Sequence, residues 1–75
     1  MRKLLQIIDA VRDNPEALND YGYLSTAEWL IVCMGVGTPE AIAALKNARY
    51  PTIPDAWTRI GSSGQQIVLE AWGAV

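Results

Sequence analysis

The chain has 75 residues, enough for one hydrophobic core, so we expect a single domain over residues 1–75. Six basic and eight acidic residues give a net charge of −2, and 51% hydrophobic against 19% charged residues excludes a disordered chain. The lack of histidine removes histidine-based catalytic triads and most zinc sites, and Cys33, the single cysteine, cannot form an internal disulfide. Because no apolar run approaches the ~20 residues of a membrane helix, we expect a soluble, cytoplasmic domain with no membrane partner.

The first part of the chain predicts one long helix and one short helix. Apolar residues recur at helical spacing and predict a helix over residues 2–13. These residues are Leu4, Ile7, Ile8 and Val11. Asn14 is a good cap residue and Pro15 suits the first helical position, so a short helix is expected at 15–19.

A capping box opens the next helix. Ser25 stands at the N-cap position and Glu28 follows three residues later. The apolar run 29–34 also fits a buried strand by periodicity, but the capping box favours a helix over 26–34. Gly35 and Gly37 are expected to end that helix.

Proline again marks a helix start after this glycine pair. Thr38 and Pro39 predict a helix over 39–47, which has to stop before Tyr50 because the residue preceding a proline is extended. Pro54 then begins a short helix at 54–60.

Gly61 is expected to close that helix and a second capping box to open the last one. Ser63 and Gln66 have the spacing of the box and predict a helix over 64–72. Its inner side is expected to carry Ile67, Val68, Ala71 and Trp72. No segment pairs as a strand, so the predicted fold class is all-α, a compact bundle of five or six short helices.

The residues that could carry chemistry have simpler structural interpretations. Cys33 lies in an apolar run with no histidine to activate it, which indicates a buried, inert thiol. The acidic residues between 13 and 20 do not follow the spacing of a calcium-binding loop. Residues 35–38 lack the third glycine of a dinucleotide fingerprint and the lysine of a phosphate loop. We therefore expect no enzymatic activity, no metal site and no cofactor.

The helix at 26–34, the glycine turn and the helix at 39–47 have the layout of a helix-turn-helix. Residues 34–45 read MGVGTPEAIAAL, and residues 49–60 read RYPTIPDAWTRI. Together they resemble the core motif and the Ile-Pro fourth helix of Cro- and repressor-like phage regulators, over about residues 25–61. The resemblance implies a small all-α homodimer that inserts its third helix into the major groove of double-stranded DNA and represses transcription.

Charge and helix geometry indicate which residues would serve that function. On the helix at 39–47 the groove face would hold Glu40, Ala43, Lys46 and Asn47. We predict DNA contacts from Lys46, Asn47, Arg49 and Arg59, within a segment 42–59 that has a local charge of +2. The last helix and Trp72 would pair two subunits.

A second hypothesis is a small acidic protein-interaction module, an adaptor or inhibitor without DNA binding. Residues 9–28 carry five acidic residues against Arg12 alone, a local charge of −4. Tyr21 and Tyr23 lie in this stretch and would be the anchors for a protein partner, with Trp72 as a further aromatic contact, because tyrosine and tryptophan are enriched at interface hot spots.

Overall fold

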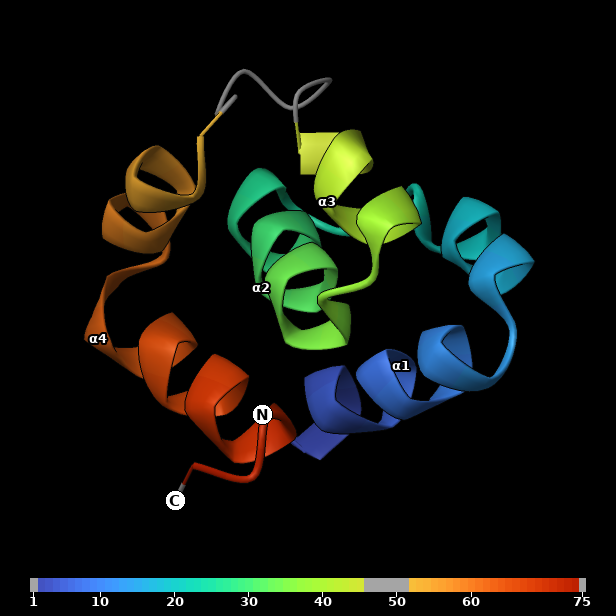
Figure 1. The fold of residues 1–75 in the computed structure, drawn as a ribbon, viewed down its shortest axis with the longest axis horizontal. Helices are drawn as coiled ribbons and strands as arrows, with labels where there is room; N and C mark the ends of the chain where they lie inside the picture. Colours follow the sequence, from blue (N-terminus) through green and yellow to red (C-terminus); the bar gives the residue numbers. More distant parts are fainter. Residues whose placement is uncertain (1, 46–51, 75) are drawn as a thin grey trace.

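The computed structural model describes residues 2–45 and 52–74, and over these ranges it contains helices and no strand, which confirms the all-α fold class (Figure 1). The elements in chain order are α1 (Arg2–Asp13), the 3-10 helix η1 (Pro15–Tyr21), α2 (Thr26–Val36), α3 (Pro39–Leu45) and α4 (Ile53–Ala71). The bounds of α1 are as predicted, η1 and α2 each extend two residues further, and positions 46 and 47 of the predicted third helix lie outside the described residues.

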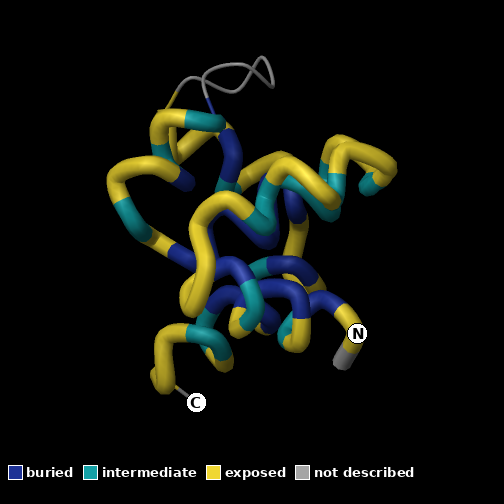
Figure 2. Tube along the Cα trace, turned by 90° about the vertical axis from the view of Figure 1, so that its right-hand side faces the viewer, coloured by how far each residue is buried: buried dark blue, intermediate teal, exposed yellow. Residues whose placement is uncertain are grey.

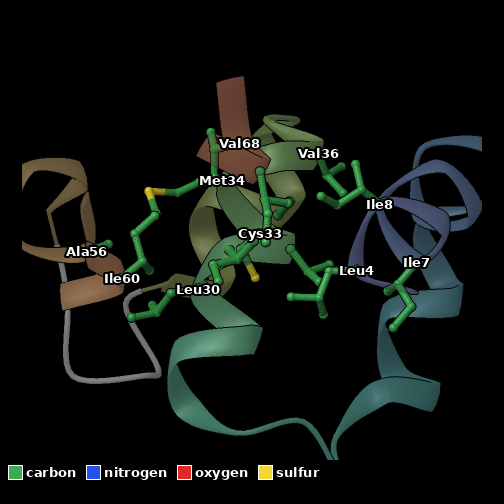
Figure 3. Packing of buried hydrophobic residues seen from close by; sticks show 14 of the residues in the cluster. Leu4, Ile7, Ile8, Leu30, Cys33, Met34, Val36, Ala56, Ile60 and Val68 are labelled. Atoms are coloured by element: carbon green, nitrogen blue, oxygen red, sulfur yellow. The ribbon is translucent and has the colours of Figure 1, made fainter. Parts of the chain in front are cut away.

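Helix α2 lies at the centre of the bundle, with α1, α3 and α4 packed around it (Figure 1). Its seven consecutive residues from Leu30 to Val36 are all buried. A helix that is apolar on every side is stable only when it is enclosed, which explains why the run 29–34 has no helical periodicity of its own. Figure 3 shows side chains of α1 and α4 converging on this helix from two sides.

The capping box of α2 is present as predicted. The backbone N–H of Ser25 donates to Glu28 Oε1 at 3.0 Å, and the N–H of Glu28 donates to Ser25 Oγ at 3.2 Å. At the other end Gly37 adopts the left-handed conformation, with φ 72°, and its N–H donates to the carbonyl of Cys33 at 3.1 Å. These two caps set the helical limits of the apolar run.

Gly35 does not end α2, contrary to the sequence-based expectation. It lies inside the helix, where a Cβ atom would come within 2.5 Å of Ile8 Cδ1. The glycine therefore serves the close approach of α1 to α2, and only Gly37 serves as the helix terminator.

The predicted caps of η1 and α3 are also present. Asn14 Oδ1 accepts the N–H of Glu16 at 3.3 Å, and Thr38 Oγ1 accepts the N–H of Ala41 at 3.3 Å. Helix η1 contains no buried residue and lies against α1 and α3, so it covers the core without contributing fully buried side chains to it.

Helix α4 begins one residue before the predicted position and contains a sharp break. Thr52 caps it, because its Oγ1 accepts the N–H of Asp55 at 3.2 Å and donates to Asp55 Oδ2 at 2.8 Å. The predicted break at Gly61 is confirmed by its φ of 71° and ψ of −179°. The predicted second capping box is wrong, since Ser63 has helical dihedral angles and the second half of α4 follows Gly61 directly.

Close packing of α4 on α2 depends on a second buried glycine. A Cβ atom on Gly64 would stand 2.7 Å from Ile60 Cβ and 3.0 Å from Ile31 Cδ1. The prediction that Ile67 and Val68 face inward is confirmed, because both are buried.

Each helix within the described ranges is too short or too polar to traverse a lipid bilayer.

Candidate functional site

Helix α3, the predicted DNA-reading helix, is joined to α2 by Gly37 and Thr38 alone and has exposed residues on one side. Lys46, Asn47 and Arg49, three of the four predicted DNA contacts, lie outside the described residues. The fourth, Arg59, is exposed on the first half of α4. The exposed residues of α3 itself are Pro39, Glu40 and Ala43, so the described part of this helix presents a carboxylate and no cation.

Trp72 binds other parts of the fold although half of its surface is exposed. Its indole Nε1 donates to the carbonyl of Met34 at 2.9 Å, and its ring stacks on Trp57 with centroids 6.2 Å apart and planes 9° apart. The residue follows α4 at the C-cap and is 50% exposed, so the expectation that it lies on the inner side of a helix is wrong. The helix ends at Ala71, and the half-exposed ring covers the end of α2 instead of entering the core.

Arg12 binds the same end of α2, a role that the sequence pattern does not predict. Its Nη2 donates to the carbonyl of Gly35 at 2.8 Å and to the carbonyl of Ala71 at 2.7 Å. These are carbonyls at the C-terminal ends of α2 and α4, which lack helical partners and carry partial negative charge. We refer to Arg12, Trp72 and the three carbonyls they bind as the carbonyl cap. The only local signal for it is a basic residue in the last turn of α1.

A second feature is formed by the last residue of α1 and the segment that follows it toward α2. Residues 13–23, which we call the arch, contain η1 and no buried residue, and in Figure 2 buried positions are confined to other parts of the chain. Tyr21 is half-buried against the core, whereas Tyr23 is 67% exposed. Their ring centroids are 6.1 Å apart and their planes are tilted by 54°. The sequence therefore identified an aromatic pair that the structure brings together at the surface.

A cation from α1 lies over one ring of this pair, that of Tyr23. Lys3 Nζ is 5.9 Å from the centroid of the Tyr23 ring, within the range of a cation–π interaction. Lys3 also acts on Glu28 at the start of α2. The pKa of the Glu28 carboxyl is lowered from its ordinary value of 4.5, chiefly by the hydrogen bonds from Ser25 and to a smaller extent by the Lys3 charge.

The arch is acidic and its carboxylates are unpaired. Asp13, Glu16 and Asp20 are exposed, and none of their side chains forms a hydrogen bond or ion pair in the structure. Arg12, the one basic residue among positions 9–28, directs its guanidinium to the carbonyl cap. The charge of the arch is therefore not neutralised by contacts within the described part of the chain.

Cys33 is fully buried in the centre of α2, which confirms the prediction of a buried thiol (Figure 3). Burial raises the pKa of this thiol to about 12, so it stays protonated and unreactive at neutral pH.

Comparisons with known proteins gave no match to a protein-family model, to a curated protein or to a solved structure. The resemblance to Cro- and repressor-like regulators therefore depends on the short motifs in residues 34–45 and 49–60.

Proposed function

We propose that this protein is a small protein-binding module whose docking surface is the arch. The observation that carries the proposal is the exposure of Tyr23, 67% of which is open to solvent beside Tyr21. The fold gains no fully buried side chain from any residue of the arch. An exposed tyrosine beside a half-buried one, on a segment without fully buried residues, is typical of an interaction surface, because tyrosine combines a large contact area with few rotatable bonds.

The electrostatics of the described surface favour a protein partner over a nucleic acid. All eight carboxylates of the chain belong to described residues, and seven of them are exposed. On α3 the exposed charge is that of Glu40, which the phosphate backbone of DNA would repel. Arg12 binds the carbonyls of Gly35 and Ala71, and Lys3 lies over Tyr23. These contacts direct both cations to groups other than α3.

Affinity capture with matched variants tests this proposal. The tagged wild type, Tyr23→Ala and Ile53→Ala are incubated with a lysate of the source cells, and the bound proteins are quantified by mass spectrometry. Ile53 is the control because it is 48% exposed and lies on α4. We expect specific partners to be retained by Ile53→Ala and depleted about tenfold with Tyr23→Ala, the effect of losing one interface anchor. Recovery of the same proteins by the wild type and Tyr23→Ala would contradict the proposal.

A second candidate function is a helix-turn-helix DNA-binding regulator. It is supported by the connection of α2 to α3 through a left-handed glycine, and by the cations Lys46 and Arg49 that follow α3 in the chain. Asn47 and Arg59 would complete the contact set. A homodimer would double these cations, and the exposed half of Trp72 is the candidate contact between subunits.

Substitution of the cations tests the regulator. If it binds DNA, Lys46→Ala and Arg49→Ala each lower the salt dependence of duplex binding by about one unit of slope. Lys3→Ala, which removes a cation near the arch, is the control and is expected to leave the slope unchanged. Equal slopes for the wild type and both variants would exclude these residues as phosphate contacts.

A further inference from the structure

We infer that the partner docks on the arch through a cationic protein segment, one that presents arginine or lysine side chains to Tyr23 and to the carboxylates of the arch. The inference rests on the proposed function and assigns the chemistry of the partner. It follows from the charge of the surface and from the way Tyr23 already interacts with a cation.

The first argument is charge complementarity. Three exposed carboxylates, Asp13, Glu16 and Asp20, lie on the same eleven-residue segment as the two tyrosines, and the segment contains no basic residue. None of the three carboxylates has a partner within the structure. A docking partner with a negative or neutral surface would leave these charges facing like charges or desolvated without compensation, which disfavours binding. A cationic segment pairs with them.

The second argument is the position of Lys3. Its ammonium stands over the Tyr23 ring at 5.9 Å, the arrangement in which the electron-rich face of an aromatic ring attracts a cation. The chain thus supplies its own cation to the ring when no partner is present. Arginine is the better ligand for the same ring, because its planar guanidinium stacks on aromatic faces and is more weakly hydrated than an ammonium. A partner arginine would displace Lys3 from Tyr23.

Titration of the isotope-labelled protein with a synthetic oligoarginine peptide at low salt tests the inference by NMR. We expect shifts of backbone amides concentrated in residues 13–23 and at Lys3. Two variants of equal charge are compared, Asp13→Asn/Glu16→Gln/Asp20→Asn in the arch and Asp9→Asn/Glu40→Gln/Glu70→Gln elsewhere. Each raises the net charge by three, from −2 to +1.

The arch variant is expected to bind the peptide about tenfold more weakly than the control variant, the effect of three surface ion pairs. Equal weakening in the two variants, or shifts spread evenly over all acidic regions, would show attraction by net charge alone and overturn the inference. An absence of binding by the wild type would overturn it as well.

Substitution of Lys3 provides a second, independent readout. Lys3→Met frees the Tyr23 ring, so oligoarginine binding is expected to tighten by about two- to fivefold, the effect of removing one exposed cation–π competitor. In a Tyr23→Ala background the same substitution is expected to produce a smaller gain, because only the change in net charge remains. Equal gains in both backgrounds would contradict the role assigned to the ring.

The two proposals fail in distinguishable ways. If affinity capture depends on Tyr23 while oligoarginine does not bind the arch, the protein-binding function stands and the cationic partner is wrong. If Tyr23→Ala leaves capture unchanged, the docking surface itself is wrong.

Discussion

The carbonyl cap and the arch use their polar side chains in opposite ways, although Arg12 of the one and Asp13 of the other are neighbours in sequence at the end of α1. In the carbonyl cap, Arg12 and Trp72 bind three carbonyls at the ends of α2 and α4, over distances between 2.7 and 2.9 Å. In the arch, the three carboxylates are unpaired and Tyr23 is 67% exposed. The comparison separates side chains that hold the fold together from side chains that remain exposed at the surface.

The contrast between the two regions also explains why Arg12 does not neutralise the acidic residues that surround it in the sequence. Arg12 is adjacent in sequence to Asp13, but its guanidinium binds carbonyls 23 and 59 residues away. Its contribution is therefore to the packing of three helices. The acidic character of the arch is left intact, and this is the property that the proposed cationic partner would recognise.

The largest effect is expected from adding side-chain volume at the carbonyl cap. Gly35→Val places a branched side chain where even a Cβ atom would lie 2.5 Å from Ile8 Cδ1. Ile8 is fully buried, so the strain cannot be relieved by moving it into solvent. We expect a loss of about 2–3 kcal/mol in the free energy of unfolding, measured by urea denaturation.

Gly22→Ala in the arch is the matched control for this substitution. A Cβ atom at Gly22 would meet no other atom within 4 Å, and its φ of −62° suits any residue. We expect no loss, and a gain of about 0.5 kcal/mol from the reduced freedom of the unfolded chain. Similar losses at both glycines would contradict the distinction between the two regions.

Removal of the Arg12 guanidinium is expected to have the next largest effect. Arg12→Met keeps an unbranched side chain but leaves the carbonyls of Gly35 and Ala71 without their donor. We expect destabilisation by about 1–2 kcal/mol, since one of the two hydrogen bonds is solvent-exposed. Lys3→Met, the loss of a cation on the surface of α1, should change the unfolding free energy by less than about 0.5 kcal/mol.

A smaller loss of stability is expected when only the indole N–H of Trp72 is removed. Trp72→Phe keeps an aromatic ring beside Trp57 and removes the hydrogen bond to the carbonyl of Met34. The expected cost is about 1 kcal/mol by urea denaturation. Tyr23→Phe removes a polar atom from the arch and is expected to leave stability unchanged within about 0.5 kcal/mol, so a cost equal to that of Trp72→Phe would give the arch a structural role.

The smallest effect is a pH dependence at the start of α2. Because the pKa of Glu28 is lowered in the folded state, its carboxylate contributes stability that is fully present above the ordinary value of 4.5. That stability is lost as the pH falls through the lowered folded-state pKa. Wild type should therefore lose more stability than Glu28→Gln on acidification below 4.5, as measured by thermal unfolding at a series of pH values. Parallel pH profiles would show that the carboxylate is not responsible.

Much of the fold could be predicted because it is encoded by residues close together in the chain. The caps at Asn14, Ser25 and Thr38, and the break at Gly61, each involve residues within four positions of one another. The capping box expected at Ser63 is absent because the left-handed Gly61 already separates the two halves of α4, and the residues after it continue directly into the helix.

The candidate site was predictable only in part. Tyr21 and Tyr23 could be identified because they are close in sequence and follow turn-forming residues. The roles of Arg12 and Trp72 could not, because the carbonyls they bind are between 23 and 59 residues away and depend on how the helices cross. The same separation explains why Trp72 was expected on the inner side of a helix.

The most direct test of the account is fluorescence anisotropy of a labelled generic DNA duplex titrated with the wild-type protein at low salt. Non-specific DNA binding by a DNA-reading domain falls at about 10⁻⁴–10⁻⁶ M and weakens as salt rises. The account, in which an acidic surface serves a protein partner, predicts no binding in this range. Salt-sensitive binding in this range would contradict it and would favour the helix-turn-helix regulator.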